Sequence, residues 1–188
     1  MNCYDFDNTI YRGDSSIHFY TYCLVRYPKI WRHLPAQLCA FVRYYLLHKG
    51  NKTEMKDVFY RYLPDIPDLD RVVQRFWDKR FGHIKPFYLE QKQADDVIIS
   101  ASPEFFLAPV CKRLGVGLLL GSRVDAGTGL HDGLNCHGEE KVRRLFESLP
   151  QAAITTFYSD SLSDSPLARL AEKAYLVKGD RVYDWPAM

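Results

Sequence analysis

The hydrophobic positions along the chain follow two different periods. Between residues 14 and 90, apolar residues recur at steps of three and four, for example at Val72, Val73 and Phe76, and this spacing predicts helices. Helix-breaking residues divide the region into several helices; they are Pro28, Pro35, Gly50, Pro64 and Pro67. Short apolar runs outside this region, such as Val97-Ile98-Ile99, are typical of strands buried in a parallel sheet.

The rest of the chain alternates predicted strands and helices. A strand-like run begins at residue 3, and further strands are predicted at 97–99, 117–120, 152–158 and 174–177. Helices are predicted at 103–114, 139–149 and 166–173, and the glycine-rich segment 122–137 is predicted to form a β-hairpin or flap. This alternation predicts an α/β fold with a parallel sheet, into which an all-helical segment is inserted. We therefore expect a core domain at 1–13 and 91–188 and a helical cap domain at 14–90.

Charge and cysteine usage exclude several classes of protein. The 188 residues include 25 Lys and Arg against 23 Asp and Glu, a formal net charge of +2, whereas dedicated nucleic-acid binders carry a strong basic excess. The five cysteines form no CxxC pair, which argues against a disulfide framework and a zinc ribbon. Because scattered thiols are typical of a reducing compartment and no signal-peptide pattern is visible, we expect a cytoplasmic protein.

Two pairs of acids follow predicted strands at distant points of the chain. Asp5 and Asp7 follow the first strand, and Asp160 and Asp164 follow the strand at 152–158. Ligands bind at the carboxyl ends of parallel strands, so both pairs are expected to meet in one crevice. Turn formation explains the first pair equally well, and helix capping explains Asp164 but not Asp160. Taken together, the four acids predict a site for a hard cation such as Mg²⁺.

Three polar residues elsewhere are weaker candidates. Ser100 follows the strand at 97–99, where a hydroxyl could donate to a phosphate or cap the next helix. Ser102 lies closer to the predicted helix start and fits capping better. Lys141 lies in the first turn of the helix at 139–149, where a solvated surface lysine is the ordinary interpretation.

The order of these elements is more specific than any one of them. Asp5-x-Asp7-x-Thr9, Ser100, Gly138-Glu139-Glu140-Lys141 and Asp160-x-x-x-Asp164 resemble the four motifs of the haloacid dehalogenase (HAD) phosphohydrolase superfamily. The helical insertion between the first and second motifs resembles the helical cap of that superfamily. The segments 100–103 and 135–141 are especially similar to its phosphoserine-phosphatase-like subfamily. The resemblance implies a Rossmann-like core with an inserted cap.

The resemblance also implies a role for each motif residue. Asp5 would be the nucleophile that forms an aspartyl-phosphate, and Asp7 the general acid and base. Mg²⁺ would be held by the Asp5 carboxylate, the Asp7 backbone carbonyl and Asp160. The remaining roles are binding of phosphoryl oxygens by Ser100 and Lys141, bracing of the phosphate-binding loop by Thr9, and support of the metal site by Asp164.

Departures from the motifs leave the substrate open. Asn8 stands where glycine is commonest, and Ser159-Asp160-Ser161 stands where phosphoserine phosphatases usually have Gly-Asp-Gly. Asp14 occupies the place of an acid that reads the substrate in that subfamily, although it also fits a helix cap. We expect a Mg²⁺-dependent phosphatase acting on a small phosphorylated metabolite. The alternatives are a phosphatidylglycerophosphate-type lipid phosphatase, a non-catalytic phosphate-binding scaffold, and transfer to an acceptor other than water.

The cap region hides a basic patch behind the near-neutral total charge. Residues 26–61 contain eight bases and two acids, a local charge of +6, with seven aromatic residues interleaved. The favoured interpretation is that the aromatic residues pack the cap and the bases are solvated. The alternative is weak contact of the cap with an anionic membrane surface, which would make the protein peripheral to a membrane. His131, Cys136 and His137 lack the further ligands that a zinc site needs.

Overall fold

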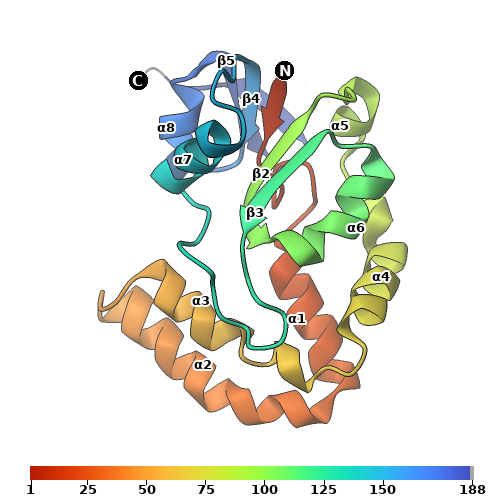
Figure 1. The fold of residues 1–188 in the computed structure, drawn as a ribbon, viewed down its shortest axis with the longest axis vertical. Coiled ribbons are helices and arrows are strands. Elements are labelled where there is room, and N and C mark those ends of the chain that lie inside the picture. Colours follow the sequence, from red (N-terminus) through yellow and green to blue (C-terminus); the bar gives the residue numbers. More distant parts are fainter. Residues whose placement is uncertain (187–188) are drawn as a thin grey trace.

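The computed structural model describes residues 1–186, and a mostly parallel six-stranded sheet forms its centre (Figure 1). The sheet order is β3-β2-β1-β4-β5-β6. The strands are β1 (Asn2–Tyr4), β2 (Val97–Pro103), β3 (Leu118–Ser122), β4 (Ile154–Ser159), β5 (Ala171–Lys178) and β6 (Arg181–Asp184). The first five are parallel, and β6 pairs antiparallel to β5. The predicted α/β fold is confirmed.

Five helices lie between β1 and β2, as the apolar spacing predicted. They are α1 (Ser15–Arg26), α2 (Leu34–Phe41), α3 (Lys52–Tyr60), α4 (Leu69–Arg80) and α5 (Pro86–Gln91). A 3-10 helix, Pro28–His33, precedes α2, and a π-helical turn, Val42–Leu46, continues it. In Figure 1, α2 and α3 form the end of the molecule farthest from the sheet. The helices of the second half are α6 (Glu104–Leu114), α7 (Glu139–Ser148) and α8 (Ser165–Ala168).

Strand alternation places two buried clusters on the two faces of the sheet. On one face, Tyr4 and Phe6 pack with residues of α1, α4 and α6, and the Trp77 indole donates to the Phe106 carbonyl at 2.6 Å. On the other face, Cys3 packs with residues of β2, β4, α7 and α8. The first cluster contains residues of both the helical insertion and the sheet, so the two share one hydrophobic core. Their division into a core domain and a cap domain at 14–90 stays a prediction.

The C-terminal part of the sheet differs from the sequence prediction. The predicted helix at 166–173 is wrong beyond Ala168, because β5 begins at Ala171 and pairs with β4 from Ile154 onward. β6 was not expected; it returns from β5 through a turn at Gly179. Backbone pairing at the end of the sheet therefore prevailed over the helical tendency of this segment.

The glycine-rich flap connects the sheet side of the molecule to α3. One bridge between Val124 and His131 closes the loop, in place of a regular hairpin. Asp57 on α3 accepts from the His131 backbone N–H at 2.9 Å and bonds the buried His131 ring at 2.6 Å. Gly129, at φ +75°, lies so close to the Tyr60 carbonyl that a Cβ would stand 2.3 Å from it. The flap therefore fixes α3 opposite the carboxyl end of the sheet.

Candidate active site

A cavity of about 250 Å³ lies at the carboxyl end of the sheet, between the strand ends and α3. The register explains its position: Tyr4 of β1 pairs with Ile98 of β2 on one side and with Tyr158 of β4 on the other. The residues that follow these three strands therefore converge. The cavity is lined by all the sequence-predicted site residues except the buried Thr9: Asp5, Asp7, Asp14, Ser100, Lys141, Asp160 and Asp164.

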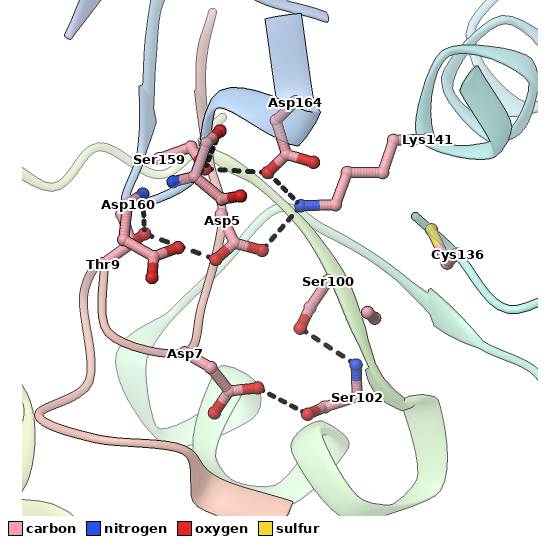
Figure 2. Close-up of polar contacts among 12 residues, drawn as sticks. Asp5, Asp7, Thr9, Ser100, Ser102, Cys136, Lys141, Ser159, Asp160 and Asp164 are labelled. Carbon is pink, nitrogen blue, oxygen red and sulfur yellow. Dashed lines mark hydrogen bonds and ion pairs between the residues drawn. The ribbon is translucent and has the colours of Figure 1, made fainter. Parts of the chain in front are cut away.

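Asp5, directly after β1, is held by two side chains. The Lys141 ammonium lies 2.6 Å from its Oδ1, and the Thr9 hydroxyl donates to its Oδ2 at 3.3 Å (Figure 2). Burial raises the pKa of the Asp5 carboxyl, and the charge of Lys141 opposes that rise. The pairing aims one carboxylate into the cavity and fixes its orientation.

Lys141 is buried between two carboxylates, contrary to the ordinary surface interpretation. It comes from the first turn of α7, is 2% exposed, and also bonds Asp164 Oδ2 at 2.7 Å. Although burial lowers its pKa, Asp5 and Asp164 hold the pKa of Lys141 above its ordinary value. The site therefore contains a permanent positive charge beside Asp5.

The last residue of β4 and the segment after it complete this polar network. The Ser159 hydroxyl donates to Asp164 Oδ2 at 2.7 Å, and the Asp160 N–H donates to the Thr9 hydroxyl at 2.9 Å. Asp164 occupies the N-cap position of α8, as the capping interpretation predicted, but its side chain makes no capping bond and bonds Lys141 instead. Thr9 therefore couples the loop after β1 to the loop after β4.

Asp7 lines the cavity and lies beside Ser102, apart from the group formed by Lys141 and Asp164 (Figure 2). Its carboxylate accepts from the Ser15 N–H at 2.6 Å and from the Ser102 hydroxyl at 2.5 Å. Burial, with the negative charge of Asp14, raises the pKa of Asp7 to about 6. A carboxyl with such a pKa can exist in both protonation states near neutral pH, which suits proton transfer.

Neither Ser100 nor Ser102 caps the helix that follows β2. α6 begins at Glu104 with Pro103 as its N-cap, so the capping interpretation of Ser102 is wrong. Ser102 instead donates to Asp7, and its N–H donates to the Ser100 hydroxyl at 3.1 Å. Ser100 is buried and lines the cavity, where its hydroxyl proton remains free to donate to a ligand.

The cap contributes an acid and two lysines to the cavity. Asp14 caps α1 by accepting from the Ile17 N–H at 2.9 Å, which confirms the capping interpretation. It also lines the cavity, and its role toward the substrate stays a prediction. Lys52 and Lys56 were missed, although their spacing of four residues places them on one face of α3. The Lys56 ammonium donates to the Ala101 carbonyl at 2.6 Å, and burial lowers the pKa of Lys56 to about 8.

The oxygen donors at this site fit a hard cation. Within residues 1–186, no group of three or more His, Cys, Asp or Glu side chains is arranged as a ready metal site. The proposed set requires only the two carboxylates of Asp5 and Asp160 with one backbone carbonyl. Burial raises the pKa of Asp160, and the buried Asp164 Oδ1 has no hydrogen-bond partner among the described residues. A divalent cation with oxygen ligands would compensate this buried negative charge.

Lys85 is a further supporting residue that sequence reasoning missed. Asn8 has a left-handed backbone (φ 58°), which asparagine tolerates and which turns the chain after Asp7. The buried Lys85 ammonium donates to the Asn8 carbonyl, and also to the Gly179 carbonyl at 2.5 Å. Lys85 therefore joins the loop after β1 to the β5–β6 turn.

Replacing Lys85 with methionine is expected to lower the free energy of unfolding by about 1–3 kcal/mol, because the loss of the buried ammonium removes two charge-assisted hydrogen bonds to carbonyl groups. Urea unfolding followed by circular dichroism measures the change. Lys92→Met is the matched control, since the exposed Lys92 also donates to one carbonyl, that of Leu114, at 2.9 Å. The control should stay within about 0.5 kcal/mol of the wild type. Equal losses in the two variants would contradict the role of Lys85.

Comparison with known protein families and sequences finds relatives over part or most of the chain. The model of the family described as HAD, haloacid dehalogenase-like hydrolase, matches residues 3–169. Protein CicA of Caulobacter vibrioides is 38% identical over 98 residues, which are 49% of this chain and 42% of that protein. Histidinol-phosphatase of Neisseria meningitidis serogroup C is 33% identical over 98 residues, 46% of this chain and 44% of that protein. The matched part is less than half the length of either relative.

Solved structures share the fold at low sequence identity. A protein of unknown function from Bordetella pertussis Tohama I has a TM-score of 0.72 at 17% identity, covering 93% of this chain and 87% of that chain. A phosphoserine phosphohydrolase-like protein from Francisella tularensis has a TM-score of 0.56 at 14% identity, covering 93% and 86%. These similarities extend over the helical insertion as well as the sheet.

Proposed function

This chain belongs to the haloacid dehalogenase-like hydrolase family, and we propose that it is a phosphatase that cleaves phosphomonoesters through an aspartyl-phosphate on Asp5. The observation that carries the proposal is the buried trio of Asp5, Lys141 and Asp164 in the same cavity as Asp7. A nucleophilic carboxylate, a fixed cation and a second carboxyl of raised pKa are the groups that phosphoryl transfer requires.

The residues divide the reaction into two displacements. In the first, Asp5 attacks phosphorus and the bond to the leaving oxygen breaks, while Asp7 gives its proton to that oxygen. In the second, Asp7 takes a proton from water, whose oxygen attacks phosphorus and releases phosphate from Asp5. The same carboxyl thus acts first as general acid and then as general base. Its pKa of about 6 supports both roles.

The charge on the phosphoryl group is balanced by groups already in position. The Lys141 ammonium beside Asp5 offsets negative charge, and the Ser100 hydroxyl donates to a phosphoryl oxygen. Mg²⁺ would be held by Asp5, the Asp7 backbone carbonyl and Asp160, with Asp164 nearby, and would neutralise the same oxygens. Thr9 keeps the two loops that carry these ligands together.

The proposed substrate is a small phosphorylated metabolite whose leaving group occupies the cap side of the cavity. Asp14, Lys52 and Lys56 line that side and provide charges of both signs. A phosphatidylglycerophosphate-type lipid phosphate is the second candidate. The aromatic side chains of Phe41, at the end of α2, and Tyr45, in the π-helical turn that follows, favour this candidate because they line the cavity with apolar surface. The helical segment 14–90 would select between them.

A panel of phosphomonoesters tests the proposed function. The purified protein with Mg²⁺ should release phosphate from p-nitrophenyl phosphate and from at least one of O-phosphoserine, histidinol phosphate or micellar phosphatidylglycerophosphate. Chelation by EDTA should remove the activity, and added Mg²⁺ should restore it. A correctly folded protein that binds phosphate but releases none from any ester would instead be a phosphate-binding scaffold.

A further inference from the structure

The helical segment from Pro28 to Leu46, which includes α2, carries a row of exposed apolar side chains. We name it the apolar stripe; it consists of Trp31, Leu34, Leu38, Val42 and Leu46. The steps of three and four residues place these side chains on one face of the continuous helical segment. Leu38 is 65% exposed and Leu46 is 71% exposed. The helix α2, which carries part of the stripe, lies along the edge of the molecule opposite the sheet (Figure 1).

α2 is inverted relative to an ordinary surface helix, which buries its apolar face. Its one buried residue is Gln37, whose amide donates to the Phe59 carbonyl at 2.8 Å and accepts from the Tyr20 hydroxyl. The inner face is anchored by the bonds of Gln37 and by the packing of Phe41 against Phe59, and leucines cover the outer face. A contiguous exposed apolar face of this kind indicates a surface that contacts a membrane or another protein.

The sequence segment that carries the apolar stripe is basic. No acidic residue occurs from Ser15 to Thr53, whereas six bases do: Arg26, Lys29, Arg32, Arg43, Lys49 and Lys52. Lys29 and Arg32 form ion pairs with Asp65, at 3.1 Å and 2.7 Å. Within residues 1–186, Arg43 and Lys49 form no ion pair, and the nearby Glu54 is bonded to Asn51. Arg43 and Lys49 line a groove between α2 and α3 that also contains Glu54. Because bases outnumber acids in this segment, an apolar and anionic surface would complement it.

We propose that the apolar stripe docks onto the surface of an anionic lipid bilayer. Insertion of Leu38 and Leu46 among the acyl chains would bury apolar area, while Arg43 and Lys49 would meet lipid phosphates. Pairing with a second copy fits less well, because it would bring two basic faces of the same sign together. No helix of residues 1–186 is long and apolar enough to cross a membrane, so the contact would lie in the interface.

Docking of the stripe would also orient the cavity. Phe41 and Tyr45 belong to the same helical segment and line the cavity from its inner side. A bound cap would hold the cavity near the membrane surface, within reach of phosphate carried by a lipid. This consequence rests on the proposed function, whereas binding of the stripe to lipid does not.

Co-sedimentation of the full chain with vesicles tests the inference without reference to catalysis. Vesicles of phosphatidylcholine with 30% phosphatidylglycerol should bind the protein at low salt, roughly tenfold more strongly than vesicles of phosphatidylcholine alone. High salt should weaken the binding. The double variant Leu38→Glu with Leu46→Glu should lose it, whereas Leu170→Glu, at a residue of 43% exposure outside the cap, should bind like the wild type. Circular dichroism and thermal unfolding check that each variant is folded.

Three outcomes would overturn the proposal. The first is a wild type that stays in the supernatant with anionic vesicles at low salt. The second is binding that the folded double variant retains, since another face would then be responsible. The third is a wild-type dimer in light scattering that the same two substitutions convert to monomer, since a second copy would then cover the stripe. Loss of phosphatase activity alone would bear only on the proposed function.

Discussion

Replacing Asp5 with asparagine is expected to lower kcat for p-nitrophenyl phosphate by at least about ten-thousandfold, because loss of a covalent nucleophile removes most of the catalytic effect. Asparagine keeps the shape of the side chain and its contact with the Thr9 hydroxyl, but its amide is a poor nucleophile. Asp164 remains as an ionic partner of Lys141 in the variant. The effect should therefore appear in kcat with little change in the fold.

Initial rates with Mg²⁺ at saturating substrate measure the effect, and mass spectrometry of acid-quenched samples detects phosphate on the protein. Asp132→Asn, at an exposed acid of the flap, is the matched control and should keep wild-type rates. A folded Asp5→Asn variant that retains a tenth of the wild-type kcat would exclude Asp5 as the nucleophile.

Replacing Lys141 with methionine is expected to cost about 3–5 kcal/mol of stability, because it leaves a buried pair of carboxylates without their cation. Asp5 and Asp164 lie 2.6 Å and 2.7 Å from the Lys141 ammonium, and all three side chains are buried. Phosphatase activity should fall as well, since the same ammonium faces the phosphoryl group in the proposed reaction. Urea unfolding with two-state analysis measures the change in free energy.

The loss should depend on pH in a defined direction. In the variant, the buried Asp5 carboxyl loses the positive charge of Lys141 that opposes the rise of its pKa, so its pKa in the folded state lies further above the unfolded value. The folded state then binds more protons than the unfolded state, so stability falls as pH rises through the folded pKa. The difference from wild type should be largest above neutral pH and should shrink on acidification.

Two further variants isolate the buried charge as the cause. Addition of Asp164→Asn to Lys141→Met should recover at least about 1 kcal/mol, because one of the two unpaired charges is removed. Lys112→Met, at an exposed lysine of α6, should change the free energy of unfolding by less than about 0.5 kcal/mol. A Lys141→Met protein as stable as the wild type at pH 8 would contradict the buried network.

The predicted sheet and helices could be derived from local patterns. The apolar steps of three and four at Val72, Val73 and Phe76 mark α4, and the run Val97-Ile98-Ile99 marks the start of β2. The failures lie where backbone pairing outweighed local tendency, as in the segment 169–173, which turns into β5. Ser102 is not a helix cap, and the side chain of the N-cap residue Asp164 makes no capping bond, because these side chains bond Asp7 and Lys141 instead.

The sequence by itself determined the family, because the order of the acidic and serine motifs is written in the chain, and the family is confirmed over residues 3–169. Only the tertiary structure decided how the motif residues lie relative to one another. The parallel register brings the ends of β1, β2 and β4 to one cavity, and burial makes Lys141 an internal cation between two acids. It also decided that Gln37 faces inward and the leucines of α2 face outward, since periodicity defines faces of a helix but packing chooses which face is covered.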